Sequence, residues 1–168
     1  MACHTRSNSF PSRPHPLFQE VDEHLCRLRS TEATSTSSSS ISHKLYDLQD
    51  LHDCVDRLLQ LPLTQQSLAQ EKHEKWASEI LDGSVRLLDV CNSAKDALVQ
   101  IKESMQDLQS IIRRKRGDET GLTTESADNA QNQLNNLESC IQDQEEGLEC
   151  LFRQLIKTRV SLLNILNH

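Results

Sequence analysis

The stretch ASEILDGSVRLLDVCNSAKDALVQIKESMQDLQSII, residues 77–112, decides the fold. Its apolar and small residues recur at alternating intervals of three and four, and Ser84 is the polar exception. This heptad pattern is typical of a helix that packs lengthwise against another helix. It predicts one long helix over residues 67–116, which begins at a capping box formed by Ser67 and Gln70.

The end of the chain repeats the same spacing, with Gln144 and Thr158 as its polar exceptions. It predicts a second long helix over residues 127–167, joined to the first by a short loop at 117–126. A short connection makes the two helices antiparallel neighbours. Beyond Gly147 a second apolar stripe appears, so this end of the helix needs cover on two sides.

Two shorter helices are expected upstream, over residues 17–30 and 42–61, the second ending at Pro62. They are expected to cover the apolar residues that flank the two long helices. The predicted fold is therefore all-α: an elongated antiparallel helical hairpin, thickened into a bundle of three to four helices over residues 17–168.

Two segments have the composition of unfolded chain. Residues 1–16 are polar, carry three prolines and contain no acid, which predicts a disordered N-terminal tail. An acid-poor start with Arg and Ser also fits an organelle transit peptide, although the prolines oppose a helix there. Residues 30–42 are mostly Ser and Thr, which predicts a flexible linker.

The composition narrows the classes of protein to consider. The formal net charge of −7 opposes nucleic-acid binding, which needs a basic surface. None of the six cysteines forms a Cys-x-x-Cys pair, and no apolar run reaches transmembrane length. Cys54, Cys91 and Cys140 fall within helical patterns and are expected in the core. An intracellular, most simply cytoplasmic, location is expected, with the nucleus or a membrane surface as alternatives.

The sequence suggests no catalytic centre. Ligands at zinc-finger spacing are absent, and no strand–turn–helix elbow or glycine-rich loop accompanies the cysteines and histidines. We therefore expect no catalytic, metal or cofactor-binding residues.

Two short motifs could bind a partner. Arg6, Ser7, Ser9 and Pro11 match a basophilic kinase site whose phosphoserine an adaptor of the 14-3-3 kind could bind. The alternative is a tail of common residues.

The second motif is a basic run just before Gly117. It could be a nuclear-localisation patch or contact acidic lipids, or it could simply offset the dipole at the end of a helix. The run consists of Arg113, Arg114, Lys115 and Arg116.

Three stretches resemble the BYPASS-like family, a plant domain of unknown function. They are RSNSFPSRPHP with VDEHLCRLRS, then LYDLQDLHDCVDRLLQLPLTQQSL with the segment from WASEIL to RRKRGD, and finally LESCIQDQEEGLECLFRQLIKTRVSLLNILNH. Family members carry a long central segment after RRKRGD, whereas here Asp118 is followed almost at once by the last helix. The chain therefore resembles a short form that lacks the central segment.

The resemblance implies no catalytic activity, no cofactor and a role in root and shoot development. Together with the helical pattern, it predicts a non-enzymatic plant scaffold that binds protein partners, or itself, through helical seams. The alternative is a peripheral membrane protein anchored by its C-terminal amphipathic helix, residues 147–168, and the basic run.

Overall fold

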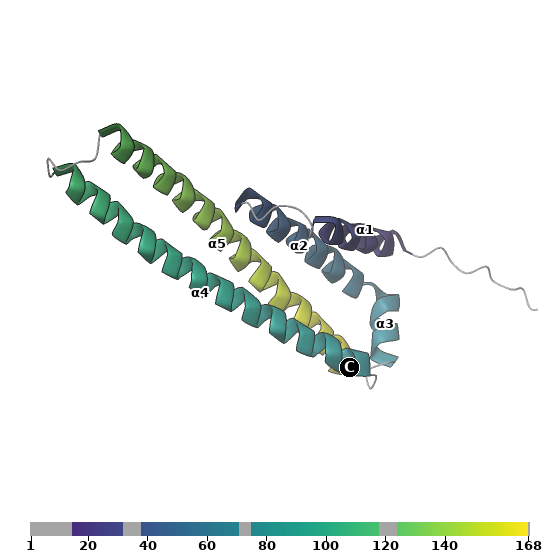
Figure 1. The fold of residues 1–168 in the computed structure, drawn as a ribbon. Coiled ribbons are helices and arrows are strands. Elements are labelled where there is room, and N and C mark those ends of the chain that lie inside the picture. Colours follow the sequence, from purple (N-terminus) through teal and green to yellow (C-terminus); the bar gives the residue numbers. More distant parts are fainter. Residues whose placement is uncertain (1–14, 32–37, 71–74, 118–123, 168) are drawn as a thin grey trace, which may run out of the picture.

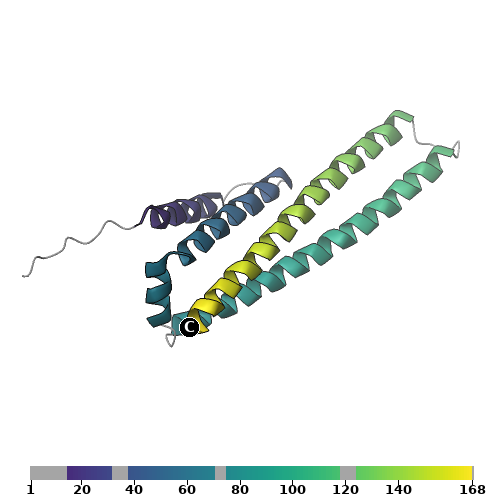
Figure 2. The same cartoon turned by 180° about the vertical axis from the view of Figure 1, so that it is seen from behind.

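A computed structural model describes residues 15–31, 38–70, 75–117 and 124–167, which form five helices and no strand. Helices α4 (Lys75–Gly117) and α5 (Thr124–Asn167) form a long antiparallel hairpin (Figure 1). Helix α2 (Ser38–Leu59) lies along α5, and α1 (Pro16–Thr31) lies along α2 (Figure 2). The prediction of an all-α hairpin is confirmed, with five helices in the described part of the chain instead of three or four.

The core of the hairpin follows the predicted heptads. On α4, Cys91, Leu98 and Met105 stand seven residues apart, and all three are buried against α5. The facing residues of α5, among them Ile141 and Leu155, are buried with them. Burial of aliphatic side chains along both helices therefore supplies the main stabilisation of the hairpin.

Helix α2 packs on α5, and no Cα atom of α2 lies within 8 Å of a Cα atom of α4 among the described residues. Its docking position is set by Gly147, which has no side chain and is buried beneath Leu45. The Gln49 side-chain amide donates a hydrogen bond of 2.9 Å to the Gly147 carbonyl. The expectation that the upstream helices pack on both long helices is therefore wrong, because α2 follows the close approach at Gly147 and packs on α5 alone of the two.

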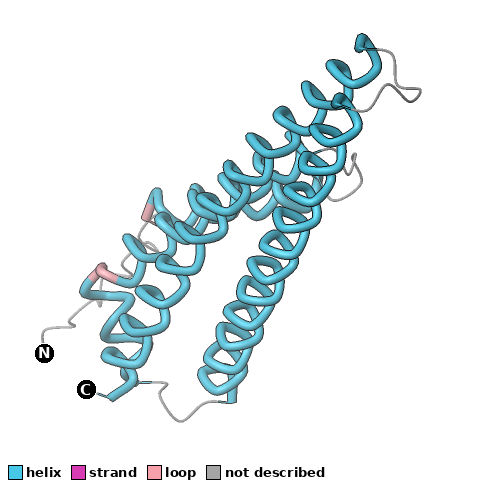
Figure 3. The backbone as a smooth tube through the Cα atoms, turned by 90° about the vertical axis from the view of Figure 1, so that its left-hand side faces the viewer, coloured by secondary structure: helices cyan, strands magenta, loops and turns pink. Residues whose placement is uncertain are grey.

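Helix α1 contacts α2 alone among the described elements. Arg57 of α2 forms an ion pair with Glu20 of α1, and the side chain of Cys54 is fully buried. The helices therefore follow one another in the spatial order α4, α5, α2, α1, with α3 (Pro62–Gln70) packed near the C-terminal end of α5 (Figure 3).

One helix was missed in the sequence. Helix α2 ends at Leu59, two residues before the predicted end, and Pro62 begins α3, because proline has no amide hydrogen to lose at the first helical position. Ser67 and Gln70 lie inside α3, so they do not form the expected capping box of the long helix. That helix, α4, begins at Lys75.

The connections between helices are shorter in the structure than the sequence predicted. Helix α1 extends to Thr31 and α2 begins at Ser38, so only residues 32–37 of the expected 30–42 linker lie outside the described residues. Serine is well tolerated at a helix start, because its hydroxyl can bond free backbone amides there. Helix α5 likewise begins at Thr124, with Glu125 in its first turn, where an acid favours the positive end of the helix dipole.

Candidate interaction surface

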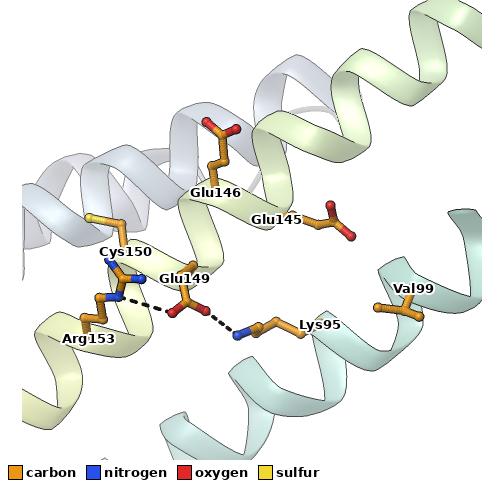
Figure 4. A pocket seen from close by; sticks show the side chains of 7 residues that line it. All are labelled: Lys95, Val99, Glu145, Glu146, Glu149, Cys150 and Arg153. Carbon is orange, nitrogen blue, oxygen red and sulfur yellow. Dashed lines mark hydrogen bonds and ion pairs between the residues drawn. The ribbon is translucent and has the colours of Figure 1, made fainter.

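The α4–α5 hairpin has a charged side and an apolar side. On the charged side, Lys95 of α4 forms an ion pair with Glu149 of α5, and Arg153 approaches the same carboxylate at 3.2 Å (Figure 4). Further along the hairpin, two turns on in α4 and one turn back in α5, Lys102 lies 2.8 Å from Glu145. The Lys95 ammonium also lies 5.5 Å from the centre of the Phe152 ring.

These charged groups are occupied with one another. The hydrogen bond from Lys95 is the main cause that lowers the pKa of Glu149, and Arg153 adds to it. Glu146, on the rim of the same hollow, accepts a hydrogen bond from Gln142. A carboxylate held ionised by two cations is a poor proton acceptor, so this side has the character of a structural ion-pair ladder.

The other side of the hairpin is an apolar groove bounded by three helices, which we call the α2–α4–α5 trough. Its volume is about 560 Å³. Helix α5 forms its floor through Leu155, Thr158, Arg159 and Leu162, α2 contributes His52 and Val55, and α4 contributes Ile80, Gly83, Ser84, Arg86, Leu87 and Val90.

The α4 wall of the trough is an exposed apolar row. Ile80, Leu87 and Val90 are 46 %, 49 % and 64 % exposed. The row continues past the trough through Ile101, Leu108 and Ile111, all of which are exposed. Four of these side chains were expected to be buried in the heptad seam (Ile80, Leu87, Ile101 and Leu108), and that expectation is wrong. Helix α5 buries one position in each heptad, whereas at the other position these four large side chains stay exposed and only Ala94 packs against the core.

The polar exceptions in the two heptad patterns have partners in the structure. Thr158 donates a hydrogen bond of 2.8 Å to Asp56 of α2, and Lys157 also lies 2.8 Å from that carboxylate. Ser84 donates to the carbonyl of Leu81 and accepts a hydrogen bond of 2.6 Å from Arg159. The polar side chains therefore fix how α2 and α4 are positioned on α5.

The trough favours uncharged occupants. Burial lowers the pKa of His52, against the opposing effect of Asp56 and Asp53, so the imidazole is neutral at neutral pH. Besides His52, only Ser84, Arg86, Thr158 and Arg159 bring polar side chains to the trough, and three of these (Ser84, Thr158 and Arg159) are paired as described above. A helix with an apolar face suits such a surface.

Among the described residues, no group of three or more His, Cys, Asp or Glu side chains is placed to hold a metal ion. Burial raises the pKa of the Cys54 and Cys91 thiols, the opposite of what a nucleophilic cysteine needs. Both thiols are buried core residues, as predicted, while Cys140 is partly buried.

The structure does not bring the two predicted motifs together. Arg6, Ser7, Ser9 and Pro11 lie outside the described residues, and the adaptor motif stays a prediction. Arg113, Arg114 and Lys115 are exposed in the last turns of α4, and Arg116 belongs to the same helix. This position suits both a helix-end charge and an accessible basic patch.

The C-terminal half of α5 uses its apolar face inside the molecule. Leu148, Leu151, Leu155 and Leu162 are all buried. No helix in the described part of the chain is long and apolar enough to span a bilayer. A membrane anchor would therefore require this helix to leave the bundle.

The trough was not foreseen in the sequence. The sequence did contain a signal for it, because α4 carries more apolar residues around its circumference than one neighbouring helix can cover. What was missing was the location of α2.

The profile of the family described as Protein BPS1 matches residues 44–128 and, in a second match, residues 120–165. The chain belongs to the BPS1 family. This is not a known enzyme family. The two BPS1 matches overlap where α4 gives way to α5, at the place where the sequence suggests that a central segment is missing. No curated protein and no solved structure matches the chain.

Proposed function

We propose that this BPS1 family chain is a non-enzymatic helical interaction protein of plants, which acts in root and shoot development by binding a helix in the α2–α4–α5 trough. The observation that supports the proposal most is the apolar row on α4. Large aliphatic side chains lie exposed on consecutive turns beside a groove that is itself apolar. Contiguous exposed apolar surface of this kind marks an interaction site.

The shape of the trough favours a helix as the occupant. Two neighbouring helices on a common floor leave a place for one more helix, as in a four-helix bundle. The exposed residues of α4 follow helical spacing, which is how a groove accepts the apolar face of a second helix.

A matched pair of valines provides the test. Val90 lines the trough, whereas Val99 lines the charged hollow on the opposite side of α4, and both are exposed. We expect Val90→Asp to lose partners that proximity labelling detects in plant cells, and Val99→Asp to keep them. An unchanged set of partners with Val90→Asp would rule out the trough as the binding surface.

The buried leucines of the C-terminal helix favour intramolecular packing over a membrane anchor. We expect the purified protein to stay at the bottom of a liposome flotation gradient. Flotation that depends on the last twenty residues would support the peripheral membrane function instead.

A further inference from the structure

We infer that the occupant of the trough is the α4 helix of a second copy of this chain, so that the protein forms an antiparallel, two-fold symmetric dimer. This rests on the proposed function and names its partner. The evidence is the order of residues along the exposed side of α4.

A second heptad seam runs along α4 and is mostly exposed, although Gly83 and Ala94 are partly buried and Ala94 also packs against the hairpin core. The row runs at alternating intervals of four and three through both the large residues and the small ones between them. Such a seam packs against another helix over its whole length, here on the order of 45 Å. In order, it contains Ile80, Gly83, Leu87, Val90, Ala94, Ala97, Ile101, Ser104, Leu108 and Ile111.

The seam is complementary to itself when two copies run antiparallel about a point between Lys95 and Asp96. Gly83 then lies opposite Leu108 of the second copy, and Leu87 lies opposite Ser104. In these two layers a small residue faces a large one, which suits close packing of two helices. Ile80 meets Ile111, Val90 meets Ile101, and Ala94 meets Ala97.

The charges beside the seam agree with the same register. Along the solvent edge of the seam, one exposed residue recurs every seven positions. These six residues are Glu79, Arg86, Ser93, Gln100, Asp107 and Arg114. In the antiparallel pair, Glu79 lies diagonally across from Arg114 of the second copy, and Arg86 lies diagonally across from Asp107, each two residues beyond the position directly opposite. Each ion pair occurs twice, because a two-fold interface repeats every contact.

The same charges disfavour the neighbouring registers. A slip of one heptad in one direction places Glu79 opposite Asp107, and a slip in the other direction places Arg86 opposite Arg114. Like charges across a helical seam are a common means of excluding wrong registers. Charge complementarity therefore selects one arrangement.

The antiparallel dimer also agrees with which parts of α4 lie beside α2 and which do not. One side of the trough is formed by His52 and Val55 of α2, and the facing side is formed by Ile80, Leu87 and Val90 of α4. The second half of the row, Ile101 to Ile111, lies nearer the turn of the hairpin. In the dimer, this half enters the trough of the other copy, so both halves are buried by one symmetric contact.

Charge reversal provides the test. By sedimentation equilibrium at micromolar concentration, we expect the wild-type chain to have twice its monomer mass of 19.1 kDa. Arg86→Glu and Asp107→Arg each place like charges opposite one another at two contacts, and each should weaken the dimer by roughly tenfold. The double variant Arg86→Glu/Asp107→Arg restores both pairs and should restore the dimer. Both residues are exposed, so neither change should unfold the chain.

A cross-link checks the register directly. We expect a benzoylphenylalanine in place of Val90 to react near Ile101 of another copy, identified by mixing isotopically light and heavy chains. A monomeric wild type, a dimer that neither charge reversal weakens, or cross-links between two Val90 positions would each overturn the inference. If the chain is monomeric but Val90→Asp still loses partners in cells, the proposed function stands with another protein in the trough.

Discussion

Leu98 and Glu103 show how sharply position on α4 decides what a residue does. Leu98 is 9 % exposed and belongs to the core between α4 and α5, whereas Glu103 is exposed on the outer face. Leu98→Asp would place a charge without a partner in that core, at a cost of roughly 3–5 kcal/mol. We expect a large loss of stability in denaturant unfolding, and almost none for Glu103→Gln. Equal losses for the two variants would contradict the register of the hairpin.

His52 links stability to pH. Burial lowers its pKa below the ordinary value of 6.5, so the folded protein releases this proton more readily than the unfolded chain. The stabilisation is therefore complete above about pH 6.5 and is lost as the pH falls towards the folded pKa. We expect unfolding midpoints to fall between pH 7 and pH 5 less steeply in His52→Gln than in the wild type. Parallel pH profiles would show that His52 does not contribute.

At the scale of helices, the two glycines inside them have different surroundings. A Cβ on Gly83 would meet nothing within 4 Å, whereas one on Gly147 would lie 3.2 Å from Leu45 Cδ1. Alanine gains about 0.5–1 kcal/mol over glycine inside a helix, and the contact with Leu45 opposes that gain at Gly147. We expect Gly83→Ala to raise the unfolding midpoint and Gly147→Ala to raise it less or lower it. A larger gain at Gly147 would argue against close packing of α2 there.

The helices themselves were readable from the sequence because each one has to bury an apolar stripe. The stripes of α4 and α5 predicted the hairpin, and a short connection predicted its antiparallel sense. What covers each stripe depends on contacts between distant residues, such as the bond between Thr158 and Asp56, which are 102 residues apart. Periodicity carries no information about such pairs. The position of α2, and with it the trough, therefore required the structure.

The small helix α3 escaped prediction for a local reason. Proline is read as the end of a helix, yet it is also well suited to the first position of the next one. Pro62 occupies that first position in α3, and the residues after it have no clear apolar face. Only the position of α3 against α5 shows that the chain continues as helix there.

At the scale of the whole molecule, the hairpin is supported unevenly. Near its base, α5 is held between α4 and α2, and α3 packs beside its C-terminal end. Towards the turn, beyond the reach of α2, the two long helices have only each other among the described elements. Local opening is easiest where fewest apolar contacts must be broken. The isolated chain should therefore open first at the turn.

Hydrogen exchange can distinguish the uneven stability along the hairpin from the protection that the dimer adds. In Arg86→Glu, diluted until sedimentation shows a monomer, we expect the amides around Leu108 and Leu137 to exchange faster than those around Leu155. In the wild type, Leu108 enters the trough of the second copy, so its segment of α4 should gain protection that depends on protein concentration. Uniform exchange along the hairpin of Arg86→Glu would contradict the uneven support. Fast exchange near Leu108 in the wild type at every concentration would instead contradict the dimer, because a buried seam cannot leave half of its residues open to solvent.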